Sequence, residues 1–384
     1  MAFSSIRVYH FRNLADTSIS TDAREVFLVG ENGQGKTNFL EAVYFVCYGS
    51  SFRTRRDEIM RRNCEQEMAV EGRFTSDGDS RTVVVKQIGR TKQIELDGAP
   101  VADRKEIVSN IPCIVFCHDD IAFVTGGPDM QRWFMNQTQS LIEPSYIAEL
   151  RRYSRVLKAR NAALKNARAD LLEVLDHQLV EAGLPLQLRR ADLARRFNEA
   201  LADIFARVFG DDLKLELSYR PSWNDPEGFS EADVISADPD QPPQALPADS
   251  PAYERSIRDQ LARGRDRDLD LRTSTRGPHR DRFPFRLDGR LLTDVASTGQ
   301  LRLVSLILRV AQAQLLSRVT GRLPVLLLDD VLLELDPTRR ARFVDALPEY
   351  EQAFFTFLPD EQYARFRRES TRMYGVRGGV IEPV

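Results

Sequence analysis

The sequence predicts an α/β protein interrupted by a helical region. Apolar strand-like runs alternate with helix-like runs at both ends of the 384-residue chain, the pattern of a sheet covered by helices. Between them, residues 129–207 are rich in Ala, Leu and Arg and repeat apolar positions near every 3.6 residues. We therefore expect one domain built from residues 1–122 and 271–384, with a helical lobe at 123–270.

The composition is that of a folded, non-membrane protein. Hydrophobic residues make up 42% and charged residues 29%, so a core can form and disorder as the main state is excluded. No apolar run reaches the ~18–20 residues of a membrane-spanning helix, and the first residues lack a secretory signal pattern. Four cysteines are too few for a disulfide framework. We expect a cytoplasmic protein with no membrane partner.

The first elements are expected to be two strands and a helix. SIRVYHFRNL at 5–14 and REVFLVG at 24–30 have strand character, and KTNFLEAVYFVCYG at 36–49 has helical spacing. Short β-type runs separated by turn residues then predict an antiparallel meander over about 66–101.

The second half contains an acidic insert, after which helix-like and strand-like runs alternate again. Residues 221–254 carry seven prolines, eight acidic residues and no Lys or Arg, which predicts a disordered, solvated insert. A helix at 301–319, a strand at 323–328, a helix from Pro337 and a strand at 352–359 follow. These elements are expected to complete the sheet of the first domain.

The sharpest chemical signal is Gly30–Thr37, which fits G-x-x-x-x-G-K-[ST] between a strand and a helix. Its glycines let backbone N–H groups surround a phosphate at the positive end of the helix. Lys36 is placed to reach the β- and γ-phosphates of a nucleotide, and the Thr37 hydroxyl to bind Mg²⁺. The predicted nucleotide-binding residues here are Gly30, Glu31, Asn32, Gly33, Gln34, Gly35, Lys36, Thr37 and Asn38.

Two later segments complement this loop. The apolar strand at 323–328 ends in Asp329 and Asp330, which suit Mg²⁺ binding and polarisation of an attacking water, respectively. Taken alone, the pair is also typical of a helix cap. Ser297-Thr-Gly-Gln300 precedes an apolar helix and offers either an anion-binding turn or a simple N-cap.

These three motifs, in this order, resemble the ATP-binding cassette heads. Further motifs narrow the resemblance to the RecF family of DNA repair proteins: FRNL at 11–14, GENGQGKTNFLEAVY at 30–44, GSSFR at 49–53, GGPDMQRWF at 126–134, YSRVLKARNAALK at 153–165, RGPHRD at 276–281, ASTGQ at 296–300 and LLLDDVLLELD at 326–336. The matches extend to about residue 357, apart from the acidic insert.

The resemblance implies a cassette-like P-loop head, with a mixed sheet and an antiparallel β subdomain, and a helical second lobe. It implies a weak, DNA-dependent ATPase of DNA replication, repair and the SOS response that uses ATP and Mg²⁺. Such a protein dimerises around ATP, binds duplex, gapped or junction DNA, and works with RecR and RecO to load recombinase at single-strand gaps. Ser297, Gly299 and Gln300 would complete the nucleotide site of the second subunit, with Asp336 near that subunit's P-loop.

Two arginine-rich segments are candidate DNA-binding surfaces. Residues 149–168 carry seven basic residues and one acidic residue, and residues 52–62 carry five arginines against two acids. Such residues bind phosphates without reading sequence, although a solvated helix face has the same composition. Because the acidic insert lowers the total, the net charge of −3 does not exclude a DNA partner. The candidates are Arg53, Arg55, Arg56, Arg151, Arg152, Arg155, Lys158 and Arg160.

The chain departs from the family pattern in several places. Leu333 replaces a Ser, Arg282 replaces an acidic residue, Leu301-Arg302 replaces Gln-Arg, and Gln131–Asn136 differs from Arg-Arg-x-Phe-Leu-Asp.

His279 is expected either in a structural hydrogen bond or near the nucleotide.

Other functions remain as alternatives. They are another cassette-type ATPase, such as a chromosome-maintenance or Rad50-like head or a transporter motor, and a scaffold that binds ATP without hydrolysing it. The 260 residues between Lys36 and Ser297 exclude a long coiled-coil arm.

Overall fold

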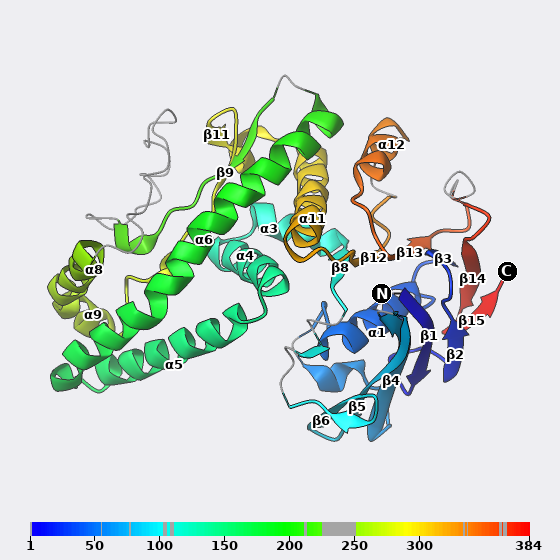
Figure 1. Ribbon diagram of the computed structural model, residues 1–384, viewed down its shortest axis with the longest axis horizontal. Helices are drawn as coiled ribbons and strands as arrows, with labels where there is room; N and C mark the ends of the chain where they lie inside the picture. Colours follow the sequence, from blue (N-terminus) through cyan, green and yellow to red (C-terminus); the bar gives the residue numbers. More distant parts are fainter. Residues whose placement is uncertain are drawn as a thin grey trace. The chain divides into compact units, whose positions relative to one another are not determined.

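The computed structural model divides into two compact units. The head comprises Met1–Asp120 and Leu316–Val384, and the helical unit comprises Ile121–Leu315 (Figure 1). The structure describes residues 2–384 except 55, 77, 103–105, 108–110, 211–212, 225–250, 333–334, 336, 361–362 and 364–366. Most of the acidic insert predicted at 221–254 therefore lies outside the described residues. Its two ends are ordered, which corrects the predicted bounds, since Ser222–Asn224 and the residues from Pro251 are helical.

The boundary of the helical unit differs from the expected one. Residues 271–315, expected in the head, pack with the helical unit. Polar contacts attach this segment: Ser274 accepts a hydrogen bond from Arg160, and Asp281 accepts one from Arg190. Both arginines belong to long helices of that unit.

The head contains a mixed six-stranded sheet that carries the P-loop. Its strands, in order, are β15 (Val380–Pro383), β14 (Arg372–Arg377), β3 (Glu25–Val29), β13 (Gln352–Phe357), β12 (Val325–Leu328) and β8 (Cys113–Phe116). All neighbours are parallel except the β14–β15 hairpin. Every residue of β8, β12 and β13 is buried, as expected of parallel strands covered on both faces.

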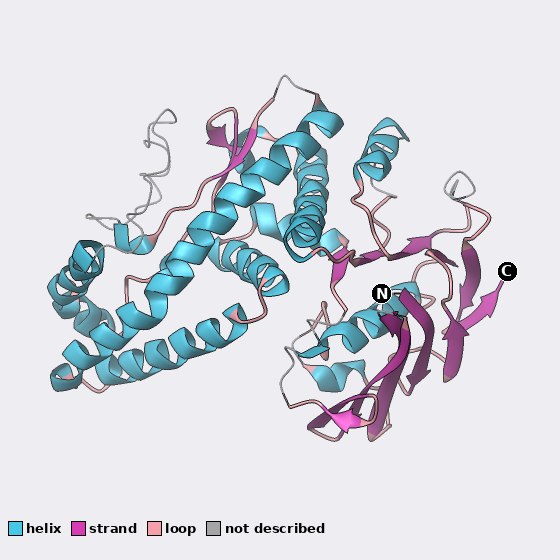
Figure 2. Cartoon of the chain, in the orientation of Figure 1, coloured by secondary structure: helices cyan, strands magenta, loops and turns pink. Residues whose placement is uncertain are grey.

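A second sheet of the head is antiparallel, which confirms the predicted β subdomain. Its strands, in order, are β2 (Thr17–Ser20), β1 (Ala2–Tyr9), β4 (Glu67–Ser76), β5 (Asp79–Ile88), β6 (Thr91–Leu96) and β7 (Ala99–Pro100). Helix α1 (Lys36–Tyr48) contacts strands of both sheets, and most of its residues are buried. Because strands of both sheets cover this helix, its sequence is apolar on more than one face. Figure 2 shows both sheets in magenta.

The remaining elements of the head are short. They are η1 (Asp57–Met60), η2 (His118–Ile121), which crosses the boundary between the units, and α12 (Pro337–Ala346).

The helical unit is built around a long antiparallel helix pair. Helices α5 (Tyr146–Lys165) and α6 (Leu172–Phe209) pack along each other, and α8 (Pro251–Arg263) joins them in a core that includes Tyr146, Leu186 and Ile257. The shared core explains the apolar periodicity of the sequence. Further helices are α3 (Ala122–Thr125), α4 (Pro128–Ile142), η3 (Ala169–Leu171), η4 (Ser222–Asn224), α9 (Arg265–Leu271) and η5 (Pro278–Arg280).

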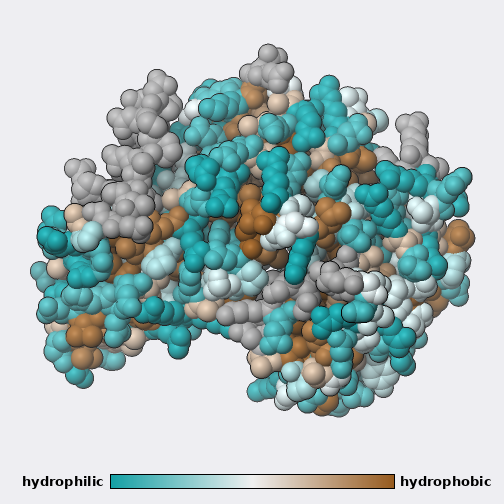
Figure 3. All heavy atoms as spheres, in the orientation of Figure 1, coloured by the Kyte–Doolittle hydropathy of each residue, from teal (hydrophilic) through white to brown (hydrophobic). Residues whose placement is uncertain are grey.

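A small sheet and two helices complete this unit. The sheet order is β11 (Arg290–Leu291), β10 (Phe285–Leu287) and β9 (Leu215–Leu217). Helices α10 (Leu292–Val295) and α11 (Thr298–Thr320) follow along the chain, and the last residues of α11, from Leu316, belong to the head. Figure 3 shows hydrophilic side chains over most of the visible face. None of the helices in the described ranges combines the length and apolarity needed to cross a membrane.

Candidate nucleotide-binding site

The predicted P-loop lies between β3 and α1 at the carboxyl edge of the parallel strands. Gly35, the residue before the helix, has φ of +120°, and Gly33 has φ of +77°, both unfavourable for residues with a side chain. The start of the loop is also tightly packed, because a Cβ on Gly30 would lie 2.3 Å from the carbonyl oxygen of Val376. The glycine spacing of the sequence thus reflects the backbone geometry of the loop and its close packing against Val376.

Lys36 is buried beneath this loop. Its Nζ donates to the carbonyl oxygens of Gly30 at 2.6 Å and Glu31 at 3.2 Å, and lies 4.0 Å from a carboxylate oxygen of Asp330. A phosphate bound in the loop would compete with these carbonyls for the ammonium group. The side chain is therefore held inside the loop where the motif predicts it.

Thr37 and Asp329 converge although they are far apart in sequence. The Thr37 hydroxyl donates to Oδ1 of Asp329 at 2.8 Å. Burial, together with the nearby charge of Asp330, raises the pKa of Asp329 to about 6. A dication beside this carboxylate would favour its ionised form, and a hydroxyl with a carboxylate is the oxygen donor set that Mg²⁺ prefers. The residues present therefore fit the ion that the motif implies.

Asp330 is positioned by Thr356, which the sequence analysis did not single out. Asp330 has φ of +50°, and its backbone N–H donates to the Thr356 hydroxyl at 2.7 Å. The same hydroxyl donates to Oδ1 of Asp330 at 2.7 Å. Thr356 lies in β13, which is next to β12 in the sheet. Its place at the carboxyl end of a parallel strand, where ligand sites form, was the sequence feature that could have pointed to it.

Glu41 of α1 joins two of the motifs that carried the resemblance. It is fully buried and receives two hydrogen bonds of 2.8 Å from the guanidinium group of Arg12. Arg53 lies 3.5 Å from the same carboxylate and donates to Asn38 at 2.9 Å, and Ser51 also donates to Glu41. FRNL and GSSFR thus meet at one buried charge directly behind the P-loop.

Ser297 and Gln300 form a capping box at the start of α11. The backbone N–H of Ser297 donates to Oε1 of Gln300 at 2.8 Å, and the N–H of Gln300 donates to Oγ of Ser297 at 3.3 Å. Ser297 and Gly299 are exposed. This motif belongs to the helical unit, and the P-loop, Asp329 and Asp330 belong to the head. Asp336 and Leu333 lie outside the described residues.

Comparisons with known proteins identify the family. The family described as "RecF/RecN/SMC N terminal domain" matches residues 2–382. A protein of Treponema pallidum (strain Nichols) named DNA replication and repair protein RecF is 40% identical over 96% of this chain and 98% of its own length. The chain belongs to the RecF family. A RecF protein of Anaeromyxobacter sp. (strain Fw109-5) is 33% identical over the full length of both chains.

Solved structures agree with the fold expected of a RecF protein. A structure of the recombination mediator protein RecF with ATP, from the RecFOR pathway, has a TM-score of 0.85 and 25% identity, covering 100% of this chain and 97% of that one. An Smc head has a TM-score of 0.54 at 14% identity, covering 100% of this chain and 97% of that chain. The predicted cassette-like head with a helical lobe is thereby confirmed as the fold.

The basic residues predicted to bind DNA fall into two groups. On α5, Arg151, Arg152, Arg155 and Lys158 are exposed, and Arg152 forms an ion pair with Glu181. In the head, Arg53 and Arg56 are exposed, whereas Arg55 lies outside the described residues.

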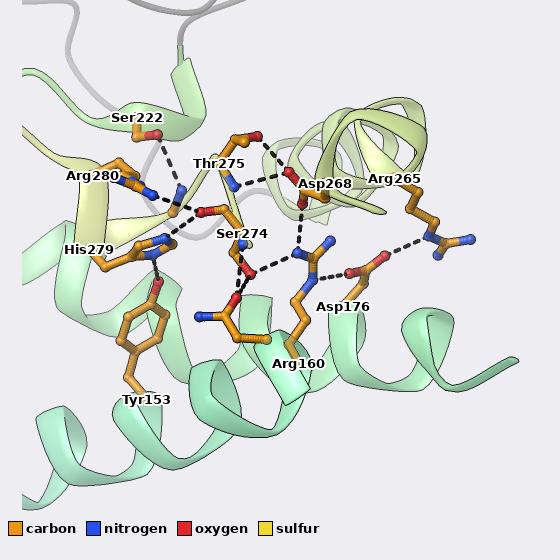
Figure 4. Close-up of polar contacts among 12 residues, drawn as sticks. Tyr153, Arg160, Asp176, Ser222, Arg265, Asp268, Ser274, Thr275, His279 and Arg280 are labelled. Carbon is orange, nitrogen blue, oxygen red and sulfur yellow. Dashed lines mark hydrogen bonds and ion pairs between the residues drawn. The ribbon is translucent and has the colours of Figure 1, made fainter. Parts of the chain in front are cut away.

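Arg160, the last of the candidates, is not on the surface. Its side chain is fully buried and donates to Asp176 at 2.7 Å, Asp268 at 2.6 Å and Ser274 at 2.8 Å (Figure 4). Arg265 pairs with the other oxygen of Asp176. A guanidinium that is already neutralised by two buried carboxylates cannot also bind a DNA phosphate, so this assignment was wrong.

His279 of the RGPHRD motif forms structural hydrogen bonds, one of the two roles that the sequence predicted for it. Nε2 lies 3.0 Å from the carbonyl oxygen of Ser274, so Nε2 carries the proton, and Nδ1 accepts from the Tyr153 hydroxyl at 2.7 Å (Figure 4). Burial, followed by nearby arginines that include Arg280, lowers the pKa of His279 to about 4. The imidazole is therefore neutral at physiological pH.

The Gln131–Asn136 departure from the family pattern lies in the helical unit. The side chain of Asn136 accepts from the Tyr146 hydroxyl and from Arg190, each at 3.0 Å. Arg190 also pairs with the buried carboxylate of Asp281 at 2.7 Å. The amide of Asn136 thus satisfies a buried guanidinium without adding a second negative charge, and Gln131 accepts from the N–H of Phe283 at 3.4 Å.

Proposed function

We propose that this chain is an ATP-driven DNA-binding protein of recombinational repair. It binds Mg-ATP in the P-loop, dimerises around the nucleotide, binds duplex, gapped or junction DNA, and hydrolyses ATP slowly to reset binding. With RecR and RecO as partners, it helps to load recombinase at single-strand gaps. Family membership supports the biological role, and the site in the head supports the chemistry.

The observation that carries the proposal is the convergence of Lys36, Thr37, Asp329 and Asp330 at one edge of the sheet. Lys36 binds the phosphates and offsets their charge as the γ-phosphoryl group leaves. Bound Mg²⁺ would supply further charge stabilisation at this point, held by Thr37 and Asp329. Asp330, fixed by Thr356, orients the attacking water and accepts its proton.

DNA binding is supported by the exposed basic residues of α5. Arg151, Arg155 and Lys158 follow one another at helical spacings of four and three residues, and so share one face. Contacts of this kind are made to phosphates, so the binding depends on DNA structure and on salt rather than on base sequence.

Sedimentation with and without Mg-ATP, on gapped duplex DNA at several salt concentrations, tests the proposal. We expect ATP to convert monomers into dimers that bind DNA with a steep salt dependence. A chain that stays monomeric with ATP and shows no salt-sensitive DNA binding would contradict it.

Two variants separate binding from hydrolysis. Lys36→Met should abolish ATP-induced dimerisation, and a mutant that still dimerises would refute the assigned site. Asp330→Asn should keep the dimer and slow turnover, because the amide cannot accept the proton of the water. A wild-type chain that dimerises without any turnover would instead support the non-hydrolysing scaffold.

A further inference from the structure

The turn of the β14–β15 hairpin contacts the P-loop through its backbone. Gly378 and Gly379 form this two-residue turn, with φ of +56° and +85°. The N–H of Gly378 donates to Oε1 of Gln34 at 2.6 Å, and the N–H of Gly379 donates to the carbonyl oxygen of Gln34 at 2.8 Å. Gln34 is one of the two middle residues of the eight-residue P-loop, so the hairpin binds the middle of the loop.

The same turn is anchored on its other side by the segment that follows β1. The carbonyl oxygen of Gly379 accepts from the N–H of Ala15 at 2.8 Å. The side chain of Asn13 contacts the P-loop from this segment, because its Oδ1 accepts from Asn38 at 2.7 Å and its Nδ2 lies 3.5 Å from the carbonyl oxygen of Gly33. The hairpin turn and Asn13 therefore support the loop from neighbouring positions.

The two glycines of the turn differ sharply in the space around them. A Cβ on Gly379 would lie 1.9 Å from the backbone oxygen of Asn13, whereas a Cβ on Gly378 would meet nothing within 4 Å. Gly379 also lies close to the P-loop itself, since its Cα is 3.5 Å from the position of a Cβ on Gly35. A side chain at Gly379 would have to displace the turn or the Asn13 segment.

We propose that the Gly378–Gly379 turn is a positioning element for nucleotide binding. It holds the P-loop in the conformation that presents its N–H groups to phosphate, so the loop is ordered before the nucleotide arrives. A pre-ordered loop loses less conformational entropy on binding and binds more tightly. The inference rests on the proposed binding of ATP at the P-loop and adds the hairpin turn as a determinant of its affinity.

A matched pair of variants tests the proposal. Gly378→Ala and Gly379→Ala both place alanine at a positive φ and incur the same kind of backbone strain, but only Gly379→Ala collides with Asn13. We expect Gly379→Ala to weaken binding of a fluorescent ATP analogue with Mg²⁺ about tenfold, on the scale of one lost hydrogen bond, and Gly378→Ala to stay within about twofold.

The kinetic signature distinguishes positioning from loss of fold. Gly379→Ala should raise KM for ATP about tenfold and leave kcat at saturating ATP nearly unchanged, because bound phosphate restores the loop. Thermal midpoints measured for both variants report their folding. Equal affinities for the two variants would overturn the proposal.

A double-mutant cycle adds a second arm. Gln34→Met removes the acceptor of the Gly378 N–H, and if the turn acts through Gln34, its effect on affinity should be smaller in the Gly379→Ala background. Fully additive losses would show that the turn does not act through the Gln34 side chain.

Hydrogen exchange tests the proposal on the wild-type chain itself. Bound Mg-ATP should slow exchange of the Gly378 and Gly379 amides, by the reciprocity of linked equilibria. Unchanged exchange at saturating nucleotide would overturn the inference alone, whereas a wild-type chain that binds no ATP would overturn the proposed function.

Discussion

The contact between Thr356 and Asp330 illustrates how one hydroxyl can set the geometry of a reactive group. A positive φ is unfavourable for a residue with a side chain, and Asp330 holds φ of +50°. Both its N–H and its carboxylate bond to the Thr356 hydroxyl, which is buried. The orientation of the carboxylate therefore depends on a residue of the neighbouring strand.

Replacing Thr356 should affect hydrolysis more than binding. Thr356→Val keeps the shape but removes both bonds, so Asp330 is free to turn away, and we expect kcat for ATP to fall about 10- to 100-fold with little change in ATP affinity. Thr356→Ser keeps the hydroxyl and should retain most of the activity. Steady-state kinetics on the three proteins checks this, and equal turnover in all of them would remove Thr356 from the site.

His279 predicts a loss of stability at acidic pH. Its pKa is lowered to about 4 in the folded chain against an ordinary 6.5, so the unfolded chain binds the proton first as the pH falls. The free energy of unfolding should therefore decrease between pH 6.5 and 4, by at most about 3 kcal/mol from this residue. Urea unfolding of wild type and His279→Gln at pH 7.5 and 5 measures the difference, and parallel pH dependences would contradict it.

At the level of elements, α5 is exposed and basic on one side and buried on the other. Neutralising the exposed residues with Arg155→Gln and Lys158→Gln should weaken DNA binding and reduce the slope of log K against log salt by about 2. The matched control is Arg195→Gln with Arg196→Gln on α6, where both guanidinium groups pair with Asp192. Equal losses in both double variants would mean that total charge, not α5, determines the affinity.

The buried side of α5 makes a different prediction. Arg160→Met leaves Asp176 and Asp268 without their shared buried partner, and breaking such a pair should lower the free energy of unfolding by about 3–5 kcal/mol. Denaturant titration measures this. Arg168→Met, in an exposed pair with Asp170, is the control and should leave the midpoint unchanged. A similar midpoint for both variants would show that the buried network does not stabilise the helical unit.

These same elements show what could and could not be predicted from the sequence. The P-loop and the Asp329–Asp330 pair were predictable, because each is a local motif on a strand whose apolar pattern is unambiguous. Arg160 was misassigned because its neighbours in the sequence are those of a basic helix face. Asp268, whose carboxylate binds Arg160 in the interior, is distant in the sequence. Thr356 was missed because its place at the carboxyl end of a strand does not by itself distinguish one hydroxyl from any other.

At the level of the whole molecule, the proposed ATP-dependent dimer would build each nucleotide site from two halves, the P-loop of one subunit and Ser297 of the other. Neither variant alone should hydrolyse ATP, because Lys36→Met cannot bind the nucleotide that brings two subunits together and Ser297→Glu lacks the second half of both sites. A mixture of the two should regain part of the activity, because the mixed dimer contains one intact P-loop facing one intact Ser297. ATPase assays of the single variants and their mixture test this, and no recovery would contradict a shared site.

The order of strands around β3 also has a consequence for synthesis. The two neighbours of β3 in its sheet are β13 and β14, which lie near the other end of the chain. At ribosomal speeds of about 5–20 residues per second, β3 and the P-loop wait for tens of seconds before either neighbour exists. During that time both edges of β3 have no partner strand, and a chain cut short before residue 352 leaves them unpaired. Nascent chains of this protein are thus expected to need chaperone cover until translation is nearly complete.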